Sequence, residues 1–340
     1  MSEDASRTLF HPFEAGMLDM PAPDAATLFL GARRGLRLPP GFAPGVRLVQ
    51  GFRPDYLALQ RLGLDVAPEP AGDDFAIGLV LCGRHRGQNE AWLREALART
   101  RAGGLVVVAG GRTEGADSLR KRVGGHLPVA GHASKHHGVV FWLERPADAV
   151  LSVSPIMQAE EIALVEGRYR AAPGMFSHDR ADAGSRFLLQ HLPQRIVGRV
   201  ADFGAGWGYL SAELLRGGAA PAALDLFEAD HASLEAARAN LAPFADRAAL
   251  AFHWRDLLQE PVARHYDLVL MNPPFHDGRA AEPAVGEGMI QAASAALKPG
   301  GRLLLVANRG LPYEKTLAGR FAASGEVARD DRYKVLWARR

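Results

Sequence analysis

The sequence has very little cysteine: Cys82 is the only one in 340 residues. A single thiol excludes an internal disulfide and any zinc site built from several cysteines. The twelve histidines give no pair of metal ligands on a predicted helix, and His136 and His137 are adjacent, so their side chains point apart. We therefore expect no metal.

A strong charge bias, a long apolar run and a leader are also missing. The net charge is +2, so any contact with nucleic acid must come from local basic patches. No run of about 18 apolar residues predicts a membrane span. The acidic start, residues 1–4, lacks the basic and apolar regions of a signal peptide. These absences favour a cytoplasmic protein in a reducing compartment.

The sequence does contain an internal repeat. Residues 96–110 and 295–308 both read as a helix, a glycine turn and a buried strand. Each half then closes with an apolar strand, 139–143 or 333–337, and 75–81 takes the place of 266–271 in the first half. An alternation of helices and strands occurs in all α/β domains, but the same order of helix, glycine turn and strands in both halves favours a duplication. We predict two tandem Rossmann-like α/β domains, 1–150 and 151–340, each a mostly parallel twisted sheet with helices on both faces.

The tetrapeptide Asn272-Pro273-Pro274-Phe275 is the most informative motif. It follows the apolar run 268–271, so it should lie at the carboxyl edge of a parallel sheet, where ligands bind. The Asn272 side-chain oxygen and the Pro273 carbonyl offer two acceptors to an amino group, and Phe275 can stack on a flat substrate. The motif predicts methylation of a planar exocyclic nitrogen; the alternative is a proline-rich turn.

A glycine-rich loop supports this interpretation. The predicted strand 199–203 ends at Asp202-Phe203, and Gly204-Ala205-Gly206-Trp207-Gly208 then leads into an apolar helix. The spacing is G-x-G-x-G, not the dinucleotide G-x-G-x-x-G. Asp202 would repel a pyrophosphate but suits the cationic amino-acid end of S-adenosylmethionine. After the next strand, Glu228 can accept both ribose hydroxyls.

Together these motifs resemble the class I S-adenosylmethionine-dependent methyltransferases. The chain is most similar to the bacterial rRNA guanine-N2 methyltransferases, both the methyltransferase C type that acts on the small subunit and its large-subunit relatives. The resemblance covers the chain well from about residue 165 and the first 150 residues weakly. It is carried by the glycine loop and by residues 174–177, 182–185, 272–278, 306–308 and 311–313.

The resemblance implies an S-adenosylmethionine cofactor and adds residues to the site. Asp256, after the predicted strand 250–254, would accept the adenine amino group, and the Leu257 backbone would pair with a ring nitrogen. The alternative for Asp256 is a helix cap. The segments 176–177 and 182–185 would help to close the pocket, or serve as an ordinary helix N-terminus.

The function that the resemblance implies is methylation of a guanine N2 in small-subunit rRNA. The base must be flipped out or unpaired, because a base inside a helix is unreachable. Large-subunit rRNA, adenine N6 and protein glutamine N5 remain alternative targets, since enzymes that methylate each of them also carry an Asn-Pro-Pro motif. A non-catalytic RNA-binding assembly factor is the non-enzyme alternative. Two fused domains also favour a monomer.

The first half lacks both motifs. Its counterparts are 82–87, without Asn-Pro-Pro-Phe, and 31–35, without the glycine triplet or preceding acid. We predict a degenerate methyltransferase-like domain that docks RNA or supports the active half. Basic clusters are often only solvated surface, but they supply candidate phosphate contacts: Arg33, Arg34, Arg37, Arg84, Arg86, Arg120, Lys121 and Arg122.

Overall fold

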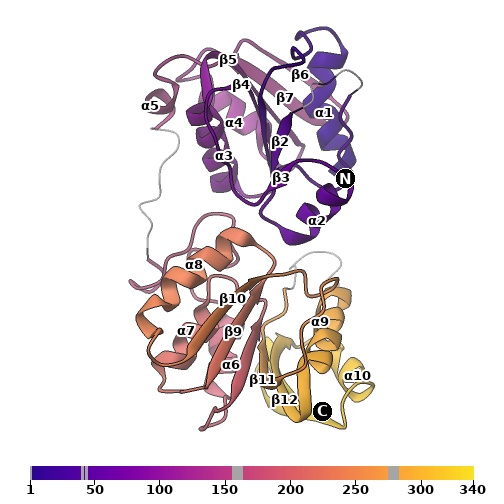
Figure 1. The fold of residues 1–340 in the computed structure, drawn as a ribbon, viewed down its shortest axis with the longest axis vertical. Coiled ribbons are helices and arrows are strands. Elements are labelled where there is room, and N and C mark those ends of the chain that lie inside the picture. Colours follow the sequence, from indigo (N-terminus) through magenta and orange to yellow (C-terminus); the bar gives the residue numbers. More distant parts are fainter. Residues whose placement is uncertain (1, 40–41, 43–44, 155–163, 275–282) are drawn as a thin grey trace. The chain divides into compact units, whose positions relative to one another are not determined.

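The computed structural model describes residues 2–39, 42, 45–154, 164–274 and 283–340 (Figure 1). The chain divides into two compact units, Met1–Ile162 and Ala163–Arg340. Among the described residues, no helix is long and apolar enough to cross a membrane.

The first unit is built on a seven-stranded sheet of order β3-β2-β1-β4-β5-β7-β6. The first five strands pair in parallel, and β7 runs antiparallel to both β5 and β6. The strands are β1 Thr27–Leu30, β2 Val46–Val49, β3 Val66–Ala67, β4 Phe75–Leu81, β5 Thr100–Gly111, β6 Gly131–Lys135 and β7 Gly138–Glu144. The helices are α1 Ser2–Glu14, α2 Arg53–Arg61, α3 Arg86–Arg99, α4 Ala116–Val123 and α5 Ala149–Val153.

Apolar side chains on both faces of this sheet hold the helices. Phe10 of α1 and Leu59 of α2 are buried against one face. Leu93 of α3 and Leu119 of α4 are buried against the other. The strands β1 and β4 are apolar almost throughout because both of their faces are covered.

The second unit repeats the arrangement, with strand order β10-β9-β8-β11-β12-β14-β13. Figure 1 shows α7 and α8 on one side of its sheet and α9 and α10 on the other. The strands are β8 Arg199–Phe203, β9 Ala223–Glu228, β10 Ala249–Trp254, β11 Tyr266–Met271, β12 Leu297–Asn308, β13 Ala323–Arg329 and β14 Tyr333–Arg339. The helices are α6 Ala183–Gln190, α7 Tyr209–Arg216, α8 His231–Leu241, a 3-10 turn Ala242–Phe244, α9 Pro283–Ala296 and α10 Tyr313–Ala318.

The two strand orders coincide position by position, so the predicted fold of two tandem α/β sheets is confirmed. One local prediction was wrong. The two glycine stretches predicted as turns lie inside β5 and β12, where each strand shifts register against its neighbour, at Phe75/Ile77 and at Tyr266/Leu268. Gly103 and Gly300 adopt φ of 73° and 78° there, a conformation that glycine adopts without steric cost, so the strand bulges without ending.

Candidate active site

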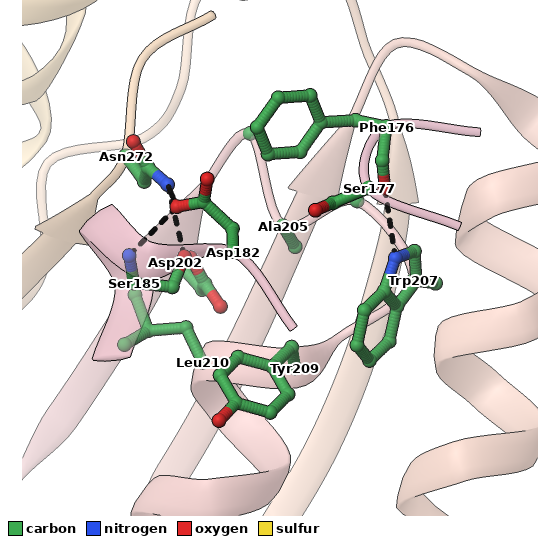
Figure 2. A pocket seen from close by; sticks show the side chains of 12 residues that line it. Phe176, Ser177, Asp182, Ser185, Asp202, Ala205, Trp207, Tyr209, Leu210 and Asn272 are labelled. Atoms are coloured by element: carbon green, nitrogen blue, oxygen red, sulfur yellow. Dashed lines mark hydrogen bonds between the residues drawn. The ribbon is translucent and has the colours of Figure 1, made fainter. Parts of the chain in front are cut away.

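A pocket lies at the carboxyl edge of the second sheet, where β8 and β11 end. It encloses about 420 Å³, including space open to solvent. Figure 2 shows its side chains, which come from the segment before α6 and its first turn, the end of β8, the glycine loop, the start of α7 and the residue after β11. The lining residues are Phe176, Ser177, Asp182, Ser185, Asp202, Gly204, Ala205, Gly206, Trp207, Tyr209, Leu210 and Asn272.

Three glycines in the left-handed backbone conformation give the glycine loop its shape. Gly204, Gly206 and Gly208 adopt φ of 74°, 54° and 85°. A Cβ at Gly208 would lie 2.7 Å from Leu241 Cδ1, so this glycine lets the start of α7 approach α8 closely. A Cβ at Gly206 would meet nothing within 4 Å. The loop therefore packs tightly at its end and leaves its middle accessible to a ligand.

Glu228 ties β9 to this loop. Its Oε2 accepts a hydrogen bond from the Gly206 N–H at 2.8 Å, and its Oε1 accepts from the N–H groups of Ala229 and Asp230, also at 2.8 Å. Burial raises the pKa of this carboxyl to about 7, against the lowering effect of the three N–H donors. A carboxylate has about four acceptor positions, so one remains for a ligand hydroxyl.

Asp202 is the buried carboxylate of the pocket. It is 1% exposed and its Oδ2 accepts a hydrogen bond from the Ser211 hydroxyl at 2.6 Å. Burial raises the pKa of Asp202 to about 6, although the hydrogen bonds with Ser211 lower it. In the part of the chain that the structure describes, no cation pairs with Asp202, and a buried acid of this kind suits a positively charged ligand.

Asn272 follows β11 directly. Its Nδ2 donates to Asp182 Oδ2 at 2.8 Å and to Ser185 Oγ at 2.9 Å (Figure 2). Its Oδ1 is buried and has no hydrogen-bond partner among the described residues. Pro273 is buried and Pro274 is exposed, whereas Phe275 lies outside the described residues. A buried acceptor without a donor is costly, so this oxygen is available to a hydrogen-bond donor of a ligand.

The segment before α6 forms another wall of the pocket. Asp182 is the N-cap of α6 and accepts from the Ser185 N–H at 2.8 Å. The two interpretations of this segment therefore hold together, since it is a capped helix start that also lines the pocket. Phe176 is 51% exposed, and its carbonyl accepts a hydrogen bond from Trp207 Nε1 at 2.9 Å. The sequence reasoning missed Trp207 and Tyr209, although they stand within and next to the glycine loop.

Four of the predicted cofactor residues are not among those that line the pocket: Gly208, Glu228, Asp256 and Leu257. Glu228 reaches the pocket wall through its bond to Gly206. Asp256 closes a turn, with Oδ1 accepting from Leu258 N at 2.9 Å and Oδ2 from Gln259 Nε2 at 2.6 Å. Leu257 packs on the apolar core beside α9. The roles of Asp256 and Leu257 toward an adenine stay predictions.

The matching edge of the first unit is filled by its own side chains. A Cβ at Gly31, the counterpart of Gly204, would lie 2.6 Å from the Trp92 ring. Arg33 bonds to Glu114 at 2.7 Å and also to the carbonyl of Cys82, directly after β4. In the described part of residues 31–45 no helix follows β1, so the amides that would face a cofactor are missing there.

Outside the pocket, the described ranges offer neither a metal site nor a reactive thiol. No group of three or more His, Cys, Asp or Glu side chains in these ranges could hold a metal ion. Burial raises the pKa of the Cys82 thiol to about 12, which makes it unreactive at neutral pH.

Comparison with known proteins supports a common origin for the second unit. The family model of the methyltransferase small domain matches residues 166–337. Ribosomal RNA large subunit methyltransferase G of Alcanivorax borkumensis is 35% identical over 176 residues, covering 51% of this chain and 44% of that protein. Ribosomal RNA small subunit methyltransferase C of Chromohalobacter salexigens is 38% identical over 170 residues, 49% of each chain.

A longer match extends into the first unit. Ribosomal RNA small subunit methyltransferase C of Shewanella piezotolerans is 30% identical over 236 residues, 68% of each chain. The chain spans about half the length of the first two relatives and about two thirds of this one. A solved T. thermophilus 16S rRNA N2 G1207 methyltransferase, in complex with AdoMet and guanosine, has a TM-score of 0.72 at 24% identity, covering 98% of this chain and 93% of its own. That structure shares the whole two-unit fold.

Proposed function

The chain belongs to the methyltransferase small domain family, and from this premise we propose that it methylates the exocyclic N2 of a guanine in small-subunit rRNA, with S-adenosylmethionine as methyl donor. The named relatives of both subunit types act on ribosomal RNA, and two of the three compared are small-subunit enzymes. Such a substrate would place the protein in the cytoplasm, and the expected monomer stays part of the proposal.

The observation that carries the proposal is the buried Oδ1 of Asn272 in this pocket, which finds no hydrogen-bond partner in the described ranges. Oδ1 can only accept a hydrogen bond, so the substrate must supply a donor, and an amino group supplies one N–H for Oδ1 and a second for another acceptor. The neighbouring Pro273 has a carbonyl but no N–H, so the motif adds a second acceptor and no backbone donor.

The residues around the glycine loop fit S-adenosylmethionine. Asp202 offers a buried negative charge to its cationic amino-acid end, and Glu228 keeps one acceptor position for a ribose hydroxyl. Gly206 leaves space for close approach to the loop backbone. When bound, this cofactor supplies a methyl group already activated on a sulfonium.

In the proposed mechanism the protein positions the amino group and stabilises its nitrogen in the more tetrahedral geometry needed for attack. An aryl-amine nitrogen is a poor nucleophile because its lone pair is delocalised. Asn272 Oδ1 and the Pro273 carbonyl would accept its two hydrogens, which favours a more tetrahedral nitrogen and aims its lone pair for in-line attack. Asn272 is too weak a base to remove a proton first, so the proton leaves after methyl transfer, to solvent.

The first unit is proposed to dock the RNA. Several of the candidate basic residues are neutralised within the unit: Arg33 pairs with Glu114, Arg122 with Glu90, and Lys121 with Asp117 at 2.8 Å. Arg84 follows β4, is exposed, and has no ion pair among the described residues. It is therefore the strongest remaining candidate for a phosphate contact.

Incubation of the protein with labelled S-adenosylmethionine and ribosomal subunits from a strain that lacks the gene tests the proposal. Label in the small-subunit rRNA, located by mass spectrometry at a guanine N2, is the expected result. Label in the large subunit, at an adenine, or in a protein would each establish one of the alternatives. Binding of RNA without any methyl transfer would instead favour an assembly factor.

A further inference from the structure

The side-chain amide of Asn272 is held from the nitrogen side by two residues of another segment. Asp182 Oδ2 receives two donors, the N–H of Ser185 and Nδ2 of Asn272, both at 2.8 Å. The Ser185 hydroxyl accepts from the same Nδ2 at 2.9 Å. Ser185 is buried, and the neighbouring Gly184 packs on the Tyr333 ring, so the start of α6 is fixed in place.

This arrangement allows only one orientation of the amide. A carboxylate has no hydrogen to donate, so the group that faces it must be the NH₂ of Asn272. Rotating the amide by half a turn would bring Oδ1 to the place of Nδ2, with two acceptors facing each other at about hydrogen-bond distance. The oxygen is therefore left as the only side-chain atom of Asn272 that can bind a substrate.

We infer that Asp182 and Ser185 are positioning residues that fix the amide of Asn272 with its oxygen available, and that they thereby restrict this position to substrate groups that donate a hydrogen bond, such as an amino group. A freely rotating asparagine would also offer its NH₂ to a carbonyl or a ring nitrogen of a base. The inference rests on the proposed function for the identity of the substrate, but the orientation itself belongs to the folded protein.

A simple helix cap does not explain the contact. The helix α8 begins with the same Asp-x-x-Ser pattern: Asp230 Oδ2 accepts from Ser233 N at 2.9 Å and from the Ser233 hydroxyl at 2.6 Å. In α6 the hydroxyl of Ser185 instead accepts a hydrogen bond from Asn272. The same local motif thus serves a second, long-range contact only beside the pocket.

The chain offers a readout of this orientation that does not depend on activity. It has only four asparagines, Asn89, Asn240, Asn272 and Asn308. Asparagine-selective ¹⁵N labelling therefore gives four side-chain NH₂ pairs, and Asn272→Ala identifies the relevant one. Asp182→Ala and Ser185→Ala should shift this pair and speed its rotation, whereas the Asn89 and Asn240 pairs stay in place as internal controls.

Kinetics give the second readout. Ser185→Ala keeps the backbone cap of α6 and removes only the contact with Asn272, so kcat should fall about threefold to tenfold. Asp182→Ala should lower kcat about 100-fold, and Asp182→Asn should lie between these values because an amide oxygen still accepts. Cofactor Kd should change less than about threefold in all three variants, since the hydrogen bonds of the replaced groups go to Asn272 and to the start of α6 and not to the glycine loop.

The outcomes separate the inference from the function on which it rests. An unchanged Asn272 signal in both alanine variants, or an unchanged kcat with only a lower melting temperature for Asp182→Ala, would reduce Asp182 to a helix cap and overturn the inference. Failure of the wild-type protein to methylate any subunit would reject the proposed function while the NMR result still decides the orientation.

Discussion

Glu228 Oε2 lies 2.8 Å from the backbone nitrogen of Gly206, so the carboxylate that ends β9 holds the middle of the glycine loop. Burial keeps the pKa of Glu228 near 7 even though three backbone N–H groups donate to it. Near neutral pH this group is therefore only partly ionised. Protonation would weaken its hydrogen bond to Gly206 and reduce the acceptor positions left for the proposed ribose contact.

Cofactor binding should depend on pH for this reason. A protonated Glu228 offers fewer acceptor positions, so the Kd for S-adenosylmethionine should fall as the pH rises from 5.5 to 7.5, by up to about tenfold per pH unit below 7. Calorimetry over this range measures the slope. Glu228→Gln should bind weakly at every pH and lose the part of the slope centred near pH 7, while the part due to Asp202, with a pKa of about 6, remains. A wild-type Kd that is constant from pH 5.5 to 7.5 would show that Glu228 does not face the cofactor.

The charge of Asp202 should lower the free energy of unfolding and strengthen cofactor binding. Its pKa in the folded protein, about 6, lies above the ordinary value of 3.8, so the folded state holds its proton more tightly. The cost to folding is absent below about pH 4 and complete above pH 6. Asp202→Asn can still accept from Ser211, so it should raise the free energy of unfolding by about 2 kcal/mol at pH 8 and by nothing near pH 4.

Denaturant unfolding at the two pH values checks this prediction, and cofactor Kd is measured on the same variant. Weaker binding together with the pH-dependent gain is the expected pair of results. A variant that is less stable than wild type at pH 8 would mean that the charge of Asp202 is already compensated within the fold.

Local patterns were enough to predict most of the fold. The apolar strands, the glycine loop and the Asn-Pro-Pro motif can each be recognised from neighbouring residues in the sequence, and the repeated order of predicted elements indicated the duplication. The hydrogen-bond partners of Asn272 could not be predicted in this way, because Asp182 is 90 residues away and the sequence around it predicts only a helix cap. Likewise, Arg33 was a candidate RNA contact because the residues near it in sequence give no sign of its ion pair with Glu114, which lies 81 residues later.

Gly208 should be the glycine of the loop that tolerates substitution least. Alanine there combines a φ of 85° with a Cβ 2.7 Å from Leu241 Cδ1 and 3.0 Å from Ala237 Cβ. Gly218 is a matched control, because its φ is 90° but a Cβ would meet nothing within 4 Å. Gly218→Ala should cost about 1–2 kcal/mol from backbone strain, and Gly208→Ala about 1–3 kcal/mol more. If denaturant unfolding shows equal losses of unfolding free energy for the two variants, α7 and α8 can move apart enough to accept the added methyl group at little cost.

Asn272→Ala should abolish methyl transfer while the cofactor still binds. The substitution removes the only side-chain oxygen offered to the amino group, and loss of one such preorganised group typically costs about 100- to 1000-fold in kcat. Its melting temperature should fall by a few degrees, because the substitution also removes the two hydrogen bonds that Nδ2 donates to Asp182 and Ser185. Calorimetric Kd and labelled-methyl incorporation are compared on one preparation. Turnover within about threefold of wild type would rule out this mechanism.

Arg84 should contribute to RNA affinity through charge. Arg84→Ala removes an exposed cation at the carboxyl edge of the first sheet, so the slope of log Kd against log salt should fall by about 0.7–1, as expected for one lost phosphate contact. Arg329→Ala is the matched control, because Arg329 is also exposed but pairs with Glu326 on β13 of the other unit. Filter binding to rRNA across a salt series measures both variants. Equal slopes for the wild type and Arg84→Ala would remove Arg84 from the docking surface, and an equal loss in the control would reveal a general effect of net charge.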